Sequence, residues 1–456
     1  MKKKLLIITV LIVLLNLQAG LNNPTAMGSS HSNALLLKGI DAVRYNPATL
    51  AFSDNYKGSI NFFPVSVLAE NSFSRNIYDD YISEDGDNEW SISDRKNILD
   101  QLDEKWRMQN NVNVDLIGFS VPRKAYTLDL QSIQDISLPV TLLDLLINGN
   151  EMGEEYSFSS EDFDAEVMNT ASLGYSFAEL VKLDGVKELF KEFSVGATIR
   201  YIYAIPSASM DDLDKNSDNE ITAAYFKLDN VDAYFGTDDI TGPNPADSNA
   251  TTLKGSFDLL TSEGGQGLGI DLGFAAKINK KMNIGLSVTN ALAGISWYKN
   301  NKVYRYDYQI NGYYLSDLED DFEFDVDSMY TLKDVSDTRK FFTVLPPEMR
   351  LDFTWEFHPG NQRLFWTNSY VQGFRNELLT TTMPEFSTGI QWNHKNADWF
   401  IFRAGITGGG DALYSSAAGF SLAFSHYSFD LGIENKYLYG ASSKGLGVAI
   451  GQKFYW

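Results

Sequence analysis

The chain has 456 residues, no cysteine and a formal charge of −23, because 60 acidic side chains outnumber 37 Lys and Arg. The absence of cysteine excludes disulfide scaffolds, thiolate metal sites and cysteine nucleophiles. The acidic surplus disfavours nucleic acid as a partner, because phosphate binding needs concentrated positive charge. No Pro-rich or Gly/Ser-rich linker divides the sequence, so one large domain is the simpler prediction.

The first twenty residues have the pattern of a secretory signal peptide. Three lysines follow Met1, an apolar run extends from Leu5 to Leu17, and small residues stand at Ala19 and Gly20. The apolar run is shorter than the roughly 20 residues of a membrane-spanning helix, which favours a cleaved signal over a permanent anchor. We expect a signal peptide over 1–20, a plug segment over 21–56 and a barrel over 57–456.

Period-two alternation of apolar and small or polar residues dominates the remaining sequence and predicts β-strands. In the last strand, Leu446, Val448 and Ile450 share one face, whereas small residues occupy the alternate positions. Each segment is near the roughly 9 to 11 residues of a tilted spanning strand. Fourteen are predicted, at about 57–67, 112–121, 125–135, 166–177, 193–203, 266–277, 282–290, 347–357, 363–373, 384–393, 398–406, 416–425, 427–436 and 445–456.

The connections between these strands alternate in length. Every second connection is short, apart from 178–192, which looks helical. The others include three long acidic ones at about 68–111, 204–265 and 291–346, with an acidic run from Asp317 to Asp327. Short periplasmic turns and long extracellular loops are typical of outer-membrane barrels. The predicted fold class is therefore all-β, a transmembrane antiparallel β-barrel of about 14 strands in a bacterial outer membrane.

The chain ends at Trp456, an aromatic residue that closes an alternating strand. This ending favours insertion by the barrel assembly machinery. Outer-membrane lipid and lipopolysaccharide are the further partners that such a barrel implies.

Ahead of the first strand, the segment Gly39 to Leu50 contains Asn46, Pro47 and Ala48. Here the sequence resembles the FadL-type outer-membrane transport proteins, whose N-terminal plug commonly leads into an Asn-Pro-Ala segment. Further stretches at 113–119, 145–150 and 171–176 look like a functionally uncharacterised branch of these barrels. Thr49 stands where Gly is usual, and Asn-Pro is also a common turn starter.

The resemblance implies a barrel whose lumen is blocked by a plug, here Asn22 to Phe52. Hydrophobic small molecules, fatty acids or other apolar compounds, would pass through it from a surface site toward a lateral opening in the wall. Asn46, Pro47 and Ala48 would fix the junction between the plug and the wall.

Catalysis is not expected, and no catalytic residue, cofactor or metal is implied. His358, His394 and His426 fall at predicted periplasmic turns and His31 in the N-terminal segment, away from a surface-facing active site. The run that begins at Asp212 has the opening spacing of a calcium loop. However, Ser217 and Ala223 stand where that loop requires Gly and Glu.

Charged residues at inward positions of the strands form the remaining candidate site. They provide either a selectivity path or internally paired charges, and the second interpretation is favoured because unpaired charges in a confined space are costly. The amphipathic stretch Leu138 to Asn148 predicts a helix that either packs on the rim or lines an apolar site. The luminal candidates are Arg200, Asp271, Arg350, Asp352, Glu356, Arg403, Asp430 and Glu434.

The leading hypothesis is uptake of a hydrophobic small-molecule ligand by a plugged barrel. The alternatives are a non-transporting barrel that serves secretion or interaction through its acidic loops, and a general porin.

Overall fold

A computed structural model of the protein describes residues 23–52, 57–82, 90–102, 104–148, 164–182, 190–205, 208–210, 224–226, 264–298, 302–308, 330–337, 341–360, 362–378, 380–394, 397–437 and 442–456. Among these residues, no helix is long and apolar enough to cross a membrane. The strands belong to one continuous sheet.

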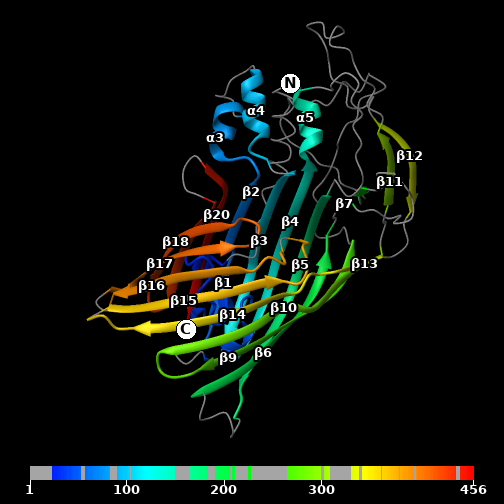
Figure 1. Ribbon diagram of the computed structural model, residues 1–456. Coiled ribbons are helices and arrows are strands. Elements are labelled where there is room, and N and C mark those ends of the chain that lie inside the picture. The colour runs from blue at the N-terminus through cyan, green and yellow to red at the C-terminus, as the bar shows by residue number, and fades with distance from the viewer. Residues whose placement is uncertain are drawn as a thin grey trace, which may run out of the picture.

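The sheet closes into a barrel with fourteen strand positions, each antiparallel to its neighbours (Figure 1). The predicted fold class is confirmed, and each predicted strand overlaps one of these positions. Around the barrel they are β1 (Ser59–Phe62) continued by β2 (Val65–Asn71), β3 (Lys105–Val121), β4 (Lys124–Pro139), β5 (Asp164–Leu180), β6 (Glu192–Ala204), β9 (Gly265–Lys277), β10 (Met282–Trp297), β14 (Glu348–Phe357), β15 (Gln362–Gly373), β16 (Glu385–His394), β17 (Ala397–Gly409), β18 (Tyr414–Ala423), β19 (Tyr427–Tyr437) and β20 (Ser443–Tyr455).

The barrel closes where the last strand meets the first. β20 pairs with β19 on one side and with β1 and β2 on the other, with Ser59 opposite Tyr455. The backbone N–H of Lys57 donates to the carbonyl of Trp456 at 2.9 Å. The sheet therefore has no free edge at this seam.

The first strand position corrects the continuous strand predicted over 57–67. It is broken at Phe63 and Pro64, where Phe63 has a φ of 48°. Proline lacks the N–H of a ladder hydrogen bond, and a positive φ turns the chain out of its extended path. The register changes across the break: Asn61 lies opposite Lys453 and Val65 opposite Ile450.

The connections distinguish the two ends of the barrel. The turn end holds the residues Gly58 and Trp456 and connections that are mostly short. The longest connections lie at the loop end. Above the loop end lie the helices α3 (Arg75–Ile77), η4 (Tyr78–Ile82), α4 (Ile92–Leu99) and α5 (Val140–Asn148) (Figure 1). The strands β7 (Ala208–Met210) and β13 (Phe341–Val344) pair with the loop-end parts of β5 and β10, and β7 continues the sheet into β8 (Ala224–Phe226), β11 (Lys302–Tyr308) and β12 (Tyr330–Asp337). The helix α5 confirms the one predicted over 138–148.

Several sequence predictions fall outside the described residues. These are the signal peptide over 1–20, the calcium-like loop over 212–223 and the acidic run over 317–327.

The helix predicted over 178–192 is wrong in its first part. Ala178 to Leu180 continue β5, because they pair with Gly196 to Ser194 of β6, and residues 183–189 are not described.

The outer and inner faces of the wall carry different side chains. Large apolar residues such as Leu173 and Leu268 point outward and are exposed, whereas their inward neighbours, such as Ser172, are small or polar. Aromatic rings gather near the turn end, where the centroids of Trp355 and Phe357 lie 4.4 Å apart. An apolar outer band with an aromatic girdle and a polar interior is the pattern of barrels that span lipid.

Candidate functional site

Residues 23–52 lie inside the barrel, and we call them the luminal segment (Figure 1). The backbone forms short helical pieces, α2 (Pro24–Met27), η1 (Ala34–Leu36), η2 (Gly39–Ala42) and η3 (Pro47–Phe52). The Asn23 side chain caps α2 by accepting hydrogen bonds from two backbone N–H groups, and Pro24 suits the first helical position. α2 contacts β18, β19 and β20, and η3 contacts β5, β6 and β9. The segment therefore crosses the lumen from one wall to another.

Glycine residues on the inner face of the wall support the luminal segment. A Cβ atom on any of them would lie within 3 Å of a backbone atom of the segment. Backbone atoms cannot rotate aside as a flexible side chain can, so only glycine allows this approach. The segment and wall thus pack backbone to backbone at this glycine seat, which we define as Gly196, Gly273, Gly405, Gly419 and Gly432.

The residues Asn46, Pro47 and Ala48 lie against β6, β9 and β10. The Asn46 Nδ2 donates to the carbonyl of Phe274 at 2.9 Å, and the Asn46 Oδ1 accepts from the N–H of Ala48 at 3.1 Å. Ser194 of β6 donates to the carbonyl of Ala48 at 3.0 Å. The asparagine side chain therefore both shapes the local turn and attaches it to the wall.

A buried cluster of charges joins the luminal segment to the last strands, toward the turn end. Lys453 of β20 forms ion pairs with Asp41 of the luminal segment and, at 3.0 Å, with Asp430 of β19. Arg403 of β17 donates to Ser421 at 2.6 Å, and Ser421 in turn donates to Asp430. Arg403, Asp430 and Lys453 are each less than a tenth exposed, which makes this network part of the packing between segment and wall.

On the loop-end side of the segment, a second network supports a bulge of β10. Arg200 of β6 contacts both carboxylate oxygens of Asp271, at 3.0 and 2.9 Å, and donates to Asn290 Oδ1 at 2.6 Å. Asn290 lies within the bulge with a φ of 51° and donates to the carbonyl of Pro346 at 3.1 Å. One asparagine side chain thus bridges β6 and the chain that enters β14.

His31 links the luminal segment to two sides of the barrel. Its Nε2 lies 3.1 Å from a carboxylate oxygen of Glu434, and its Nδ1 lies 3.1 Å from the Tyr45 hydroxyl. Arg350 of β14 donates to the carbonyl of His31 at 2.8 Å. Burial raises the pKa of Tyr45, so its hydroxyl keeps the proton that it can donate. Both imidazole nitrogens have partners, which leaves neither free to act on a ligand.

A cavity of about 300 Å³ lies on the loop-end side of the luminal segment. The segment supplies its floor through His31 and Val43 to Tyr45. Small-molecule sites in proteins usually have about 300 to 1,000 Å³, so this cavity suits a small ligand.

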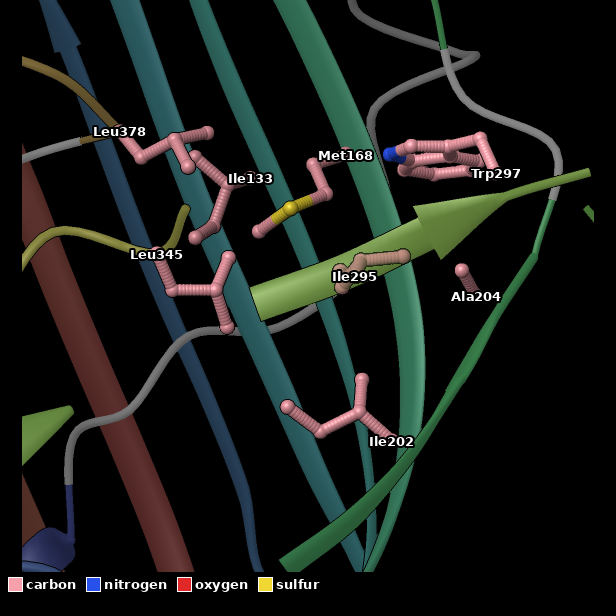
Figure 2. Packing of buried hydrophobic residues seen from close by; sticks show 8 residues of the cluster. All are labelled: Ile133, Met168, Ile202, Ala204, Ile295, Trp297, Leu345 and Leu378. Atoms are coloured by element: carbon pink, nitrogen blue, oxygen red, sulfur yellow. The ribbon is translucent and has the colours of Figure 1, made fainter. Parts of the chain in front are cut away.

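One wall of the cavity is apolar. It belongs to the apolar cluster, a buried group from β4, β5, β6, β10 and two loop-end connections whose side chains gather in Figure 2. Ile133, Met168, Leu345 and Leu378 of this group line the cavity itself. The rest of the lining is largely polar and rich in carboxylates. The whole apolar cluster consists of Ile133, Met168, Ile202, Ala204, Ile295, Trp297, Leu345 and Leu378.

The eight predicted luminal charges fall into separate groups, and each of them has an ion-pair or hydrogen-bond partner. Those that line the cavity are Arg200, Asp271, Arg350 and Glu434; Arg403 and Asp430 lie toward the turn end, Asp352 is buried beside Ser369, and Glu356 pairs with Arg363 at the turn-end rim. This arrangement is a set of local pairs, without a continuous charged path.

Sequence reasoning missed three features: the contact of His31 with Glu434, the pair of Asp41 with Lys453, and the apolar cluster. The first two join residues 403 and 412 positions apart, and no local pattern reports such a pairing. The third had a signal, because inward positions of β4 to β6 change from small or polar to Ile133, Met168 and Ile202 toward the loop end.

The comparison with known proteins finds no curated sequence that matches the chain. Solved structures with a similar course of the chain include the Ralstonia pickettii toluene transporter TbuX, with 10% identity, a TM-score of 0.46 and coverage of 97% of this chain and 100% of that chain. The CymD monoaromatic hydrocarbon channel has 12% identity, a TM-score of 0.45 and coverage of 96% and 98%. A Pseudomonas aeruginosa FadL homologue has 12% identity, a TM-score of 0.40 and the same coverage.

These three structures are similar to the chain over nearly its whole length. A family model described as a family of unknown function, DUF5723, matches residues 47–433, and the chain belongs to that family.

Proposed function

We propose that this protein is an outer-membrane barrel that takes up small hydrophobic molecules, with the luminal segment as its plug. The observation that carries the proposal is the apolar cluster beside the cavity above the luminal segment. The interior of a spanning barrel is ordinarily polar. A buried apolar wall next to a cavity of ligand size is what an apolar molecule needs to leave water.

The outer surface supports the place of the barrel in a bilayer. Its apolar band and aromatic girdle suit contact with outer-membrane lipid and lipopolysaccharide. Trp456, exposed at the turn end beside Gly58, is accessible as a signal for the barrel assembly machinery. In this orientation the loop end and its cavity face the outside of the cell.

The luminal segment separates the cavity from the turn end, so uptake requires that it move. Backbone packing at the glycine seat and the ion pair of Asp41 with Lys453 hold it in place. A ligand that enters the cavity touches the floor at Val43, Arg44 and Tyr45. Binding at that floor is therefore the step that couples a ligand to movement of the plug.

The test measures entry of two probes into intact cells that express the barrel. N-phenyl-1-naphthylamine, a neutral apolar dye, becomes fluorescent when it passes the lipopolysaccharide layer. Nitrocefin, a polar compound cleaved by a periplasmic β-lactamase, reports an open pore. Relative to cells that lack the barrel, we expect the dye to enter faster and nitrocefin to be cleaved at the same rate.

Two variants of β5 make the test specific. Met168→Trp fills the cavity, because Met168 is buried on the inner face, and we expect it to abolish the gain in dye entry. Leu173→Trp adds the same ring to the outer face, where Leu173 is exposed, and should leave entry unchanged. Equal entry in both variants would overturn the proposal. Accelerated nitrocefin cleavage would indicate a porin, and no entry of either probe a barrel that only binds partners.

A further inference from the structure

Three carboxylates in the lining of the cavity lack partners. Glu70 of β2, Glu348 of β14 and Glu385 of β16 all line it. Within the part of the chain that the structure describes, none of these carboxylates has a hydrogen bond or an ion pair within 4 Å. Carboxylates that are removed from water without a partner are costly, so this side of the cavity favours a positively charged group.

The cations around the cavity are already engaged. Lys436 pairs with Glu434 at 3.3 Å, although Glu385 and Glu70 also act on it electrostatically. Arg200 is held by Asp271 at 2.9 Å. Arg44, which also lines the cavity, pairs with Asp115. None of these three lining cations is therefore left for the free carboxylates.

Arg350 is committed as well. Its Nη1 donates to the His31 carbonyl and to Ser369 Oγ, each at 2.8 Å, and lies 3.8 Å from Asp352. The contacts of Arg350 are thus with the luminal segment and with neighbouring strands of the barrel, although Arg350 also attracts Glu348 electrostatically at longer range. The neighbourhood of Glu348 remains acidic, because Glu385 lies near it.

Two buried amide atoms of residues that line the cavity lack partners. The Nε2 of Gln131 and the Oδ1 of Asn111 each expose less than 1 Å² and have no hydrogen-bond partner. Both residues line the same cavity. Buried amide atoms are almost always hydrogen-bonded in proteins, so these two are exceptions within the lining.

The apolar cluster occupies the other part of the lining, where Ile133, Met168, Leu345 and Leu378 gather (Figure 2). The lining of the cavity therefore combines an apolar patch with carboxylates that lack partners. A purely apolar molecule would leave the carboxylates unpaired, and an anion would meet repulsion from them.

We propose that the cavity selects amphipathic organic cations, with the apolar body against the apolar cluster and an ammonium group beside Glu348 and Glu385. This inference rests on the proposed function and names the class of molecule that enters. It requires no covalent step. The ligand gains a charge-assisted contact at one end and leaves water at the other.

The test compares three probes that share a phenyl ring and differ in charge: 2-phenylethylammonium, 2-phenylethanol and 3-phenylpropanoate. Binding to the full-length protein in detergent is measured by equilibrium dialysis at pH 7. A hydrogen bond to a charged group contributes a free energy that corresponds to roughly tenfold in affinity. We therefore expect the cation to bind at least about tenfold more tightly than the alcohol, and the carboxylate to bind least tightly.

Charge-neutral variants locate the effect. Glu348→Gln with Glu385→Gln keeps the shape of both side chains, so we expect it to bring the cation to the affinity of the alcohol. Glu179→Gln, an exposed residue at the turn end that pairs with Arg123, makes the same kind of change outside the cavity and should alter nothing. The wild-type comparison of the three probes stands even if the double variant fails to fold.

Each outcome decides between the two proposals. Equal binding of cation and alcohol, or preference for the carboxylate, overturns the selection of cations and leaves hydrophobic uptake intact. Loss of cation preference in Glu179→Gln as much as in the double variant also overturns it. Binding of no probe would overturn the proposed function together with this inference.

Discussion

Lys453, three residues before the end of the chain, forms an ion pair with Asp41 of the luminal segment across a separation of 412 residues. Lys453 also holds Asp430 at 3.0 Å, so one buried cation separates two buried carboxylates. The last strand of the barrel is thereby joined to the segment inside it.

Replacement of Lys453 by Met tests this connection. Without the lysine, Asp41 and Asp430 remain buried without their cation, and removal of one partner of a buried pair costs about 3 to 5 kcal/mol. We expect a corresponding loss in the free energy of unfolding, measured by urea titration in lipid vesicles, and faster hydrogen exchange over 23–52. Lys124→Met, at an exposed position of β4, is the control. A Lys453→Met protein with unchanged exchange in the luminal segment would show that the pair does not hold it.

The glycine seat predicts a contrast between two glycines of β17. Gly405→Ala places a methyl group within 3 Å of the Ser29 backbone, whereas a methyl group at Gly408 meets no atom closer than 4.0 Å. Overpacking costs about 1 to 3 kcal/mol. Here we expect the luminal segment, rather than the wall, to be displaced, which would open a path through the lumen. We expect Gly405→Ala to raise single-channel conductance in planar bilayers and Gly408→Ala to behave as wild type. Equal conductance of the two variants would argue against the seat.

Asn46 predicts a separation of two roles. Asn46→Asp keeps an oxygen that accepts from the N–H of Ala48 but loses the donation to the Phe274 carbonyl. Asn46→Ala loses both contacts and leaves the buried N–H of Ala48 without this acceptor, at about 1 to 3 kcal/mol. Hydrogen exchange at Ala48 should therefore increase more in the Ala variant than in the Asp variant. The reverse order would mean that the main role of Asn46 is its hydrogen bond to the Phe274 carbonyl of the wall.

The bulge of β10 predicts a similar contrast at Asn290. Asn290→Ala loses the contacts to Arg200 and Pro346 and also places a Cβ-bearing, non-Asn residue at a φ of 51°, which costs about 1 to 2 kcal/mol. Asn290→Gly loses the same contacts without that strain. Thermal unfolding should rank wild type above Gly and Gly above Ala. If Ala is as stable as Gly, backbone strain is not significant at this position.

The strands could be predicted from the sequence because each has to present one apolar and one polar face. The alternation around Leu446, Val448 and Ile450 therefore located β20 to within two residues at its start. The break at Phe63 and Pro64 was visible in principle, since proline interrupts a ladder. The extension of β10 to Trp297 was not, because the two extra residues of the bulge around Asn290 interrupt the local alternation.

The candidate site was only partly predictable. Charged residues at inward positions followed from the same alternation, but their partners depend on register around the whole barrel. Arg200 and Asp271 lie on strands that pair side by side, although a long connection separates them in sequence. The free carboxylates of Glu70, Glu348 and Glu385 become one site only when β2, β14 and β16 surround the same cavity.

The glycine seat also fixes an order of events in time. Its residues come from β6, β9, β17, β18 and β19, so it exists only once distant parts of the chain have assembled. The luminal segment is synthesised before all of them. Contacts between residues so far apart in sequence form late, because a long loop has to close first. The luminal segment is thus made before the barrel strands but packs last, and until then Leu35, Leu37 and Ile40 remain accessible to any chaperone or protease that meets the chain.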